Sequence, residues 1–267
     1  MIASAGVHAD PAKDIPQRER MGAQIVKPNF NQLVLQGIRK MPKGGGYETS
    51  RRAAMGIRYS MVYRDNQLVV NARHAVPSYC SGATYLAFLY AVKEAERKGY
   101  LKLSQSDAIA LLARGQQDGV GVWGRWNANG PGTAVFFHET GIGKNFESYQ
   151  GAKPGDFMKI FWTDEIGKKE FGHSVIYLGS FRKDGAHWVK FWSSNQKQGY
   201  GEKSVPASKI KWAIFSRITD IRKVGNVDRI SKKNTFLADM LTKSYSQKDV
   251  RKKAGMKSGT RRTFLGL

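Results

Sequence analysis

The clearest hydrophobic pattern in the chain lies between residues 80 and 98. Apolar residues recur there at intervals of three and four, the last turns are charged, and Gly99 follows as a stop. The recurring apolar positions are Tyr85, Leu86, Leu89 and Val92. This spacing places them on one face of a helix, and glycine is typical just after a helix end. The pattern therefore predicts a helix over residues 80–98, reached by a loop that contains Pro77.

Three short apolar runs farther along the chain are typical of β-strands. They cover residues 157–162, 174–178 and 188–193. The last two runs flank an Asp-Gly turn signal, so residues 173–193 are predicted to form a hairpin. Its two strands then bring residues 193–195 beside the start of the hairpin. The helix and these antiparallel strands together predict an α+β fold.

The remaining patterns are weaker and predict shorter elements. A helix is expected near residues 30–41 and another at 106–113, where Ser104 can serve as the N-cap. Residues 58–70 fit either a helix or a hairpin. Residues 119–132 are rich in glycine and tryptophan, and we expect a loop there.

Composition adds a strong positive charge to this picture. The 267 residues are 41% hydrophobic and 11% aromatic, which suffices for a single core. The net charge of +23 favours an anionic partner, which can be nucleic acid, anionic lipid headgroups or an anionic cell-wall polymer. No recognised nucleic-acid-binding motif accompanies the charge, although nucleic acid stays open as a partner. We expect no transmembrane segment, because no apolar run is long enough.

The chain divides into four predicted segments, 1–9, 10–50, 51–218 and 219–267. The first is short and apolar, and it fits either the rear half of a secretory signal or a disordered end. The second is expected to be an N-terminal extension or linker, with flexible glycines at 44–46. The third is the globular domain. The fourth is a basic C-terminal tail with short helices near residues 235–243 and 247–253.

The only cysteine, Cys80, opens the predicted helix. A lone cysteine is most often a small buried hydrophobic residue. However, a helix N-terminus has unpaired backbone N–H groups that stabilise an anion, so they lower the pKa of a thiol placed beside them. Ser81 and Gly82 follow, and their small side chains leave room for a substrate. This position favours Cys80 as a nucleophile.

A nucleophilic cysteine needs a base, and His173 is the best candidate among the five histidines. It opens the predicted hairpin, and His138 is its main competitor. The base needs a polar partner that fixes its tautomer and orientation. Asn195 is the first choice and Ser193 the second, because the hairpin places both beside His173. Alternatively, Asn195 is an ordinary turn residue.

This order of motifs resembles the NlpC-type peptidoglycan peptidases and the related CHAP amidases, which share a papain-like core. The resemblance covers residues 75–200 and lies in a helix that opens with Cys-Ser-Gly, a Lys-Pro-Gly-Asp-Phe leader, and Gly-His-Ser-Val-Ile-Tyr-Leu-Gly. It implies a papain-like core whose catalytic helix packs on an antiparallel sheet. It also implies that Cys80 attacks an amide, that His173 is the base, and that Asn195 or Ser193 orients the imidazole.

The chain departs from that family at several positions. Tyr79 stands where an aspartate commonly precedes the cysteine, and the segment between Gly99 and Gly151 is long. In the family an aromatic residue upstream of the cysteine often closes the site, and Tyr59 and Tyr63 are the candidates here. These departures leave the cysteine and the histidine in place and change the expected contacts with substrate.

Candidate substrate contacts surround the predicted nucleophile. Tyr79 and Ser81 adjoin Cys80 in sequence, while Trp123 and Trp126 offer flat surfaces suited to glycan or peptide. The alternative is that both tryptophans anchor a long loop to the core.

No metal or other cofactor is expected. The motif His-Glu-x-x-His is missing from the sequence, and one cysteine with scattered histidines gives no usual ligand spacing. The acidic residues Asp156 and Glu170 are expected to be solvated or turn residues.

The sequence thus predicts a cysteine hydrolase that cleaves an amide bond in peptidoglycan stem peptides through an acyl-enzyme. The expected partner is peptidoglycan or another anionic polymer, an inhibitor protein stays open, and the expected location is periplasmic or secreted. One alternative is a papain-like hydrolase or acyltransferase that acts on a protein or lipid. Another is a non-catalytic basic protein that binds nucleic acid or an anionic wall polymer.

Overall fold

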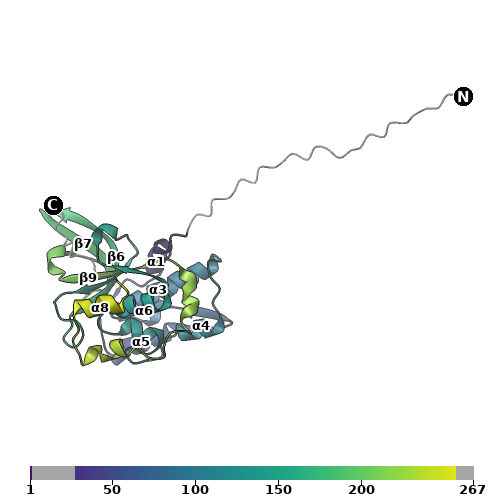
Figure 1. Ribbon diagram of the computed structural model, residues 1–267, viewed down its shortest axis with the longest axis horizontal. Helices are drawn as coiled ribbons and strands as arrows, with labels where there is room; N and C mark the ends of the chain where they lie inside the picture. Colours follow the sequence, from purple (N-terminus) through teal and green to yellow (C-terminus); the bar gives the residue numbers. More distant parts are fainter. Residues whose placement is uncertain (2–27, 257–267) are drawn as a thin grey trace.

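The computed structural model describes Met1 and residues 28–256, and within them the protein has a mixed α+β fold, as predicted. Seven of the described strands form one antiparallel sheet in the order β1-β8-β7-β6-β5-β9-β4, which packs against helices (Figure 1). These strands are β1 (Gly44–Gly45), β4 (Gly143–Phe146), β5 (Phe157–Phe161), β6 (Gly172–Lys183), β7 (Ala186–Asn195), β8 (Gly199–Pro206) and β9 (Trp212–Ile218). A separate hairpin pairs β2 (Met61–Arg64) with β3 (Gln67–Val70).

The helices lie before, between and after these strands in the chain. They are α1 (Phe30–Arg39), α2 (Arg51–Tyr59), α3 (Cys80–Arg97), α4 (Gln105–Ala110), α5 (Gly121–Asn127), α6 (Gly132–Thr140), α7 (Thr235–Ala238) and α8 (Gln247–Lys253). Short 3₁₀ turns occur at Ala72–His74, Tyr149–Gly151, Ala207–Lys209, Ile221–Asn226 and Asp239–Leu241.

The central helix α3 begins at Cys80 and ends at Arg97, so the helix predicted over residues 80–98 is confirmed. Apolar residues cover most of its circumference, and Leu86, Phe88 and Leu89 are completely buried. A helix that is apolar nearly all round lies in a core. It contacts the helices α1 and α5 and the strands β6 and β7.

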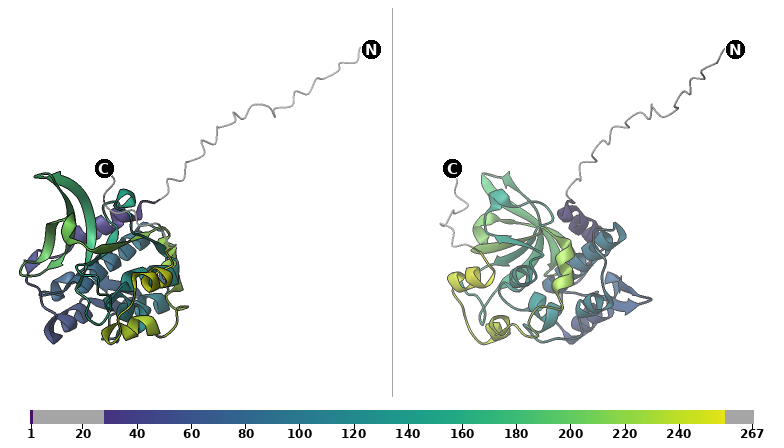
Figure 2. Two further views of the ribbon diagram at one scale, coloured as in Figure 1. Left: turned by 60° about the vertical axis from the view of Figure 1, so that its left-hand side comes forward. Right: turned by 45° about the vertical axis from the view of Figure 1, so that its right-hand side comes forward.

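The hairpin of β6 and β7 is confirmed and is longer than its apolar runs. Asp184 and Gly185 form its turn with φ values of 50° and 72°, and two left-handed residues are what a tight hairpin turn requires. Ile176 pairs with Trp192, and this register brings the start of β6 beside the end of β7. The outer end of the hairpin projects away from the helices (Figure 2).

The loop predicted over residues 119–132 is wrong, because α5 and the start of α6 occupy this segment. Its glycines are needed for close packing rather than for a flexible chain. A Cβ on Gly124 would collide with the carbonyl oxygen of Gln117, and one on Gly132 with that of Arg125. Glycine in a helix often marks such a close approach of two backbones.

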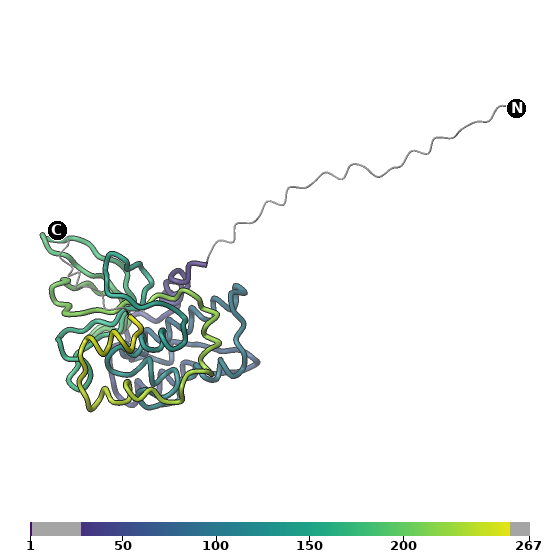
Figure 3. Tube along the Cα trace, in the orientation of Figure 1, coloured from purple at the N-terminus to yellow at the C-terminus, as the bar shows by residue number. Residues whose placement is uncertain are grey.

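Within the described residues, the flexible glycine linker predicted at 44–46 is wrong, whereas the short helices predicted in the C-terminal segment are confirmed. Helix α1 packs on α3 and buries Leu33 and Val34, while Gly44 and Gly45 pair with β8 as a sheet edge. The yellow C-terminal segment lies along the body of the protein (Figure 3), where Leu237 is completely buried in an apolar cluster. The apolar residues of both segments decide their packing, although the C-terminal segment is rich in basic residues. The proposed signal segment, 1–9, lies outside the described residues except for Met1.

Two further predictions concern the region around α3. Residues 58–70 end α2 and then form the β2–β3 hairpin, with left-handed Asp65 and Asn66 at its turn. Ser104 caps α4, as expected, through a reciprocal capping box with Asp107. Among the described residues, no helix has the length and apolar character needed to cross a bilayer.

Candidate active site

Cys80 occupies the first position of α3, where the extended chain becomes a helix. Tyr79 is the N-cap residue, with φ −129° and ψ 169°, and its side chain makes no capping hydrogen bond. The Ala83 N–H donates to the Tyr79 carbonyl oxygen. The N–H groups of the first turn before Ala83 have no intrahelical acceptor, and with the helix dipole they favour an anion at this end.

The thiol of Cys80 meets three groups from other parts of the fold. His173 hydrogen-bonds to the sulfur from the start of β6, and Ser174 directs its backbone N–H at the same atom. The hydroxyl group of Tyr47 is a third hydrogen-bonding partner of the sulfur. The fold therefore brings the predicted nucleophile and the predicted base into direct contact.

The imidazole of His173 is held from its far side by Asn195. Its Nε2 lies 3.2 Å from Asn195 Oδ1, while Asn195 Nδ2 donates to the Gly201 carbonyl oxygen at 2.9 Å. Because Nδ2 is used in this way, Oδ1 is the acceptor and Nε2 carries the hydrogen. Nδ1 is then the nitrogen left to take a proton from the thiol. The ring of Trp162 lies at an interplanar angle of 27° to the imidazole, with 6.5 Å between the centroids.

Ser193, the second choice for the orienting residue, has a different contact. Its hydroxyl group donates to the Ser174 carbonyl oxygen at 2.7 Å, so it ties β7 to β6. Both Ser193 and Asn195 are buried, but Asn195 alone of the two has a hydrogen bond with the imidazole in the described structure. The geometry thus favours Asn195 as the residue that orients His173.

The surroundings lower the pKa of Cys80 to about 6. Burial is the largest single influence and acts in the opposite direction, because it penalises the charged thiolate. The hydrogen bond and charge of His173, the Ser174 N–H and the ammonium group of Lys159 together outweigh burial. At pH 7 the sulfur is therefore mostly a thiolate, which is the form that attacks a carbonyl carbon.

Tyr47 is a functional candidate that sequence reasoning missed. Burial, the charge of Cys80 and the hydrogen bond with it raise the pKa of Tyr47, so the hydroxyl group stays protonated at neutral pH. The upstream aromatic residues considered from sequence do not line the cavity beside Cys80. Tyr59 is 61% exposed, and the hydroxyl group of Tyr63 lies 3.4 Å from Asn66 Oδ1.

A cavity of about 470 Å³ opens beside Cys80. Tyr79 and Ser81 line it, as the sequence suggested, and the Ser81 hydroxyl donates to Asn127 Oδ1 at 2.7 Å. Most of the lining groups are polar. The lining residues are Tyr47, Thr49, Ala54, Tyr79, Cys80, Ser81, Asp118, Asn127, Ala128, Asn129, Lys159, Glu170, Gly172, Ser174 and Leu241. Such a cavity can hold a peptide-sized group with its amides hydrogen-bonded to the wall.

Trp123 and Trp126 do not belong to this lining. They are 5% and 1% exposed, and Trp126 stacks on Phe88 of α3 with 4.9 Å between ring centroids. The Trp126 indole N–H donates to Thr84 Oγ1 at 3.1 Å. This geometry favours the alternative in which both tryptophans belong to the core, where they brace the helix that carries Cys80.

Two acidic residues expected to be solvated are buried instead. Asp156 is completely buried and forms an ion pair of 2.5 Å with Arg217. Glu170, whose side chain is 2% exposed, pairs with Lys159 at 2.5 Å in the wall of the cavity. Each acid is buried with a cation, which offsets the cost of removing its charge from water. Sequence spacing gave no signal for either pair.

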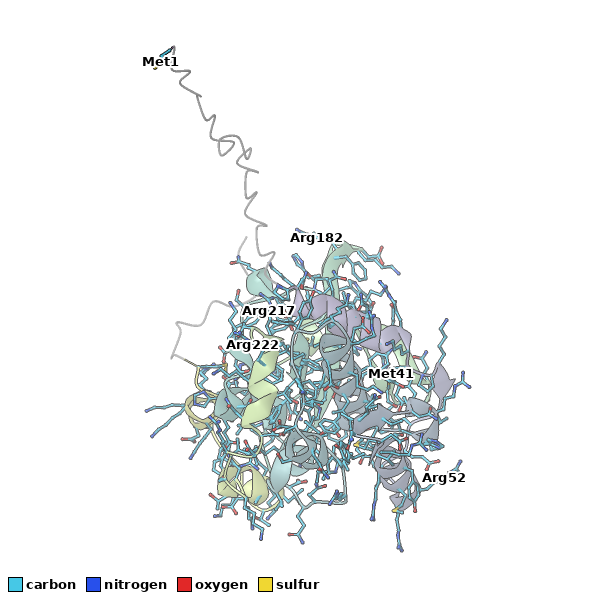
Figure 4. The ribbon with its side chains drawn as sticks, turned by 90° about the vertical axis from the view of Figure 1, so that its right-hand side faces the viewer. Met1, Met41, Arg52, Arg182, Arg217 and Arg222 are labelled. Carbon is cyan, nitrogen blue, oxygen red and sulfur yellow. The ribbon has the colours of Figure 1, made fainter. Side chains whose placement is uncertain are left out.

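The remaining candidates lie away from the thiol. His138, the competing base, is exposed on α6 and does not line the cavity. Within the described part of the chain, no three His, Cys, Asp or Glu side chains are grouped as metal ligands. Basic side chains are spread over the surface, and the labelled Arg52, Arg182 and Arg222 lie far from one another (Figure 4).

Comparisons with known proteins assign no family to this chain. No protein-family model matches it, and neither the curated proteins nor the solved structures contain a match. What the site can do therefore has to be inferred from its own residues.

Proposed function

We propose that the protein is a cysteine hydrolase with a papain-like core that cleaves an amide bond in peptidoglycan stem peptides through an acyl-enzyme. One observation carries the proposal: Cys80, His173 and Asn195 form a continuous hydrogen-bonded row that begins at a helix N-terminus. The nucleophile, base and orienting group of a cysteine hydrolase require this order of contacts. A helix that begins with the cysteine and packs on an antiparallel sheet also supports the papain-like core.

Acylation begins when the thiolate of Cys80 attacks the carbonyl carbon of the amide. A C–S bond forms and the carbonyl oxygen becomes an oxyanion, for which the backbone N–H of Cys80 and the hydroxyl group of Tyr47 are the proposed donors. The C–N bond then breaks. The leaving nitrogen takes the proton that His173 had received from the thiol, so a neutral amine departs and a thioester remains.

Deacylation uses water as the second nucleophile. His173 takes a proton from the water, whose oxygen attacks the thioester carbon. The C–S bond breaks, the carboxylic acid is released and its proton passes to solvent at neutral pH, while the pair of Cys80 and His173 returns to its starting state. Asn195 holds Nε2 throughout both steps, so the ring keeps one orientation.

Support for the substrate comes from three features of the chain. Residues 75–200 carry the resemblance to NlpC-type and CHAP enzymes, and the cavity offers hydrogen-bonding groups suited to peptide amides. The net charge of +23 favours retention on an anionic wall polymer. A peptidoglycan substrate places the site of action in the periplasm or outside the cell.

The proposal is tested by incubating purified sacculi with the protein and measuring the release of new amino groups. The wild type should release them, and Cys80→Ala should reduce the rate by several orders of magnitude, because the members of such a unit fail together. Equal release by Cys80→Ala would refute the nucleophile. Hydrolysis of model acyl esters without any action on sacculi would retain the enzyme and reject this substrate.

A further inference from the structure

We propose that Lys159 and Glu170 form an oriented ion pair whose ammonium end faces the catalytic cavity, and that this end selects substrates with a carboxylate beside the scissile amide. The substrate half of the inference rests on the proposed function. The anion site itself rests on the ion pair and the cavity and needs no assumed substrate, so the two can be tested separately.

The position of Lys159 in the sheet brings its charge to the reacting atoms. Lys159 pairs across β5 and β6 with Ser174, the residue whose backbone N–H meets the Cys80 sulfur. Its side chain lines the same cavity as Cys80. The charge of the ammonium group is one of the influences that favour the thiolate. Lys159 is therefore the member of the pair whose charge is known to act on the sulfur.

The two members of the pair differ in their access to the cavity. The Lys159 side chain is 13% exposed, whereas that of Glu170 is 2% exposed. Glu170 Oε1 pairs with Lys159 Nζ, and its Oε2 accepts the Gly167 N–H at 3.2 Å. Among the described residues, Glu170 is the only acid within 4.0 Å of Lys159 Nζ. Because an ammonium group has three donors, hydrogen-bonding capacity remains for a further anion.

Space for the pair is provided by Gly172, the residue before His173. A Cβ at this position would lie 2.7 Å from Lys159 Nζ and 2.8 Å from its Cε, closer than real Cβ contacts. Gly172 does not have a left-handed φ, so here the missing side chain matters rather than backbone freedom. The same backbone stretch thus carries the base and makes room for the ion pair.

A buried ion pair is poor evidence for stability, because apolar residues of similar volume often stabilise a fold as well. A charged pair in the wall of a reaction cavity instead creates a local field that favours one sign of charge. The ammonium end is the more exposed member of the pair in this cavity, so a substrate carboxylate that enters next to the scissile carbonyl would be attracted. A neutral carboxamide at the same position would not be attracted in this way.

Two alkylating reagents of similar size test the anion site without any assumed substrate. Iodoacetate carries a carboxylate and iodoacetamide is neutral, and in both the thiolate displaces iodide to form a C–S bond. The rate constant for iodoacetate at Cys80 is divided by that for iodoacetamide. This ratio is then divided by the same ratio for glutathione, so that the intrinsic reactivities of the two reagents cancel. Rates are measured at pH 8.5, where even an ordinary thiol reacts.

Four proteins are compared: wild type, Glu170→Gln, the double variant Lys159→Met/Glu170→Gln, and Lys190→Met. The double variant removes both charges and leaves no buried charge unpaired. Lys190→Met is the matched control, because Lys190 also forms a 2.5 Å ion pair, with Glu202, but does not line the cavity. Circular dichroism and thermal melting establish that each variant is folded.

The ratio should rise in Glu170→Gln, fall about tenfold in the double variant relative to wild type, and stay unchanged in Lys190→Met. Equal ratios in wild type and double variant would overturn the anion site. A fall of the ratio in both Glu170→Gln and the double variant would also overturn the anion site. A purely structural role of the ion pair predicts a change in the same direction for both variants.

Peptide substrates then test the substrate half. Two stem peptides that differ only by a carboxylate or carboxamide beside the scissile bond are compared by kcat/KM. The wild type should prefer the carboxylate, and the double variant should lose this preference. Equal rates on both peptides by the wild type would overturn the substrate half. If neither peptide is cleaved while the alkylation ratio behaves as expected, the proposed function fails and the anion site stands.

Discussion

The contact between Asn195 and His173 makes a quantitative prediction for the variant Asn195→Ala. The substitution removes the Oδ1 acceptor, which lies 3.2 Å from His173 Nε2. The imidazole then loses the group that fixes its tautomer and can rotate away from Cys80. The substitution also removes the Nδ2 donor, which hydrogen-bonds to the carbonyl oxygens of Gly201 and Ser193 at 2.9 Å and 3.3 Å.

These two losses have different magnitudes and different readouts. One hydrogen bond of about 1 to 1.5 kcal/mol corresponds to about a five- to tenfold loss in rate, and a larger loss follows if the ring turns fully away. The loss of the two hydrogen bonds to carbonyl oxygens, in contrast, lowers the free energy of unfolding by about 2 kcal/mol. We therefore expect slower amide hydrolysis together with a moderate fall in stability.

Ser193→Ala is the matched control for this prediction. It removes the 2.7 Å bond to the Ser174 carbonyl oxygen, so it weakens the same strand pair but leaves the imidazole contact intact. Hydrolysis of stem peptides and urea unfolding are measured for both variants. Asn195→Ala should be slow and Ser193→Ala close to the wild-type rate. If Ser193→Ala is the slower enzyme, or if Asn195→Ala keeps full activity, the assigned role of Asn195 is refuted.

Three further substitutions test other parts of the site and fold. Tyr47→Phe removes one oxyanion donor and should lower kcat about 100-fold with little change in melting temperature, whereas an unchanged kcat would remove Tyr47 from the mechanism. Gly172→Ala places a Cβ against the flexible ends of the Glu170 and Lys159 side chains, which can shift, and should therefore lower the free energy of unfolding by only about 1 kcal/mol in urea titrations. Arg125→Met should cost about 3 to 5 kcal/mol in the same assay, because Arg125 is completely buried and bonded to Glu139, Gly119, Gly121 and Ser231. Wild-type stability of either variant would contradict these contacts.

The parts of the fold that sequence predicts well are those with a local signal. The helix that starts at Cys80 follows from apolar spacing, and the β6–β7 hairpin follows from two apolar runs around Asp184 and Gly185. That hairpin alone places Asn195 beside His173, so the pair was predictable. The contact of His173 with Cys80 depends on how α3 packs on β6, which no local pattern specifies.

The features that sequence misses depend on contacts between distant segments. Tyr47 reaches Cys80 because it forms a parallel bridge with Ser78, after glycines that pair with β8 and so do not act as a linker. Glu170 looks solvated in sequence, since its charge is compensated only when the fold brings Lys159 close. The glycines of α5 and α6 indicated a loop, although they mark tight packing.

The pH dependence of Cys80 alkylation tests the central claim most directly. Iodoacetamide rates are followed from pH 4 to 10 for wild type and His173→Ala, with the modified residue identified by mass spectrometry. The wild-type midpoint should lie at about 6, and the variant midpoint should rise to about 8.5 or above, because burial then opposes the thiolate without its main partner. An ordinary midpoint in the wild type, or equal midpoints in both proteins, would contradict a thiolate activated by His173.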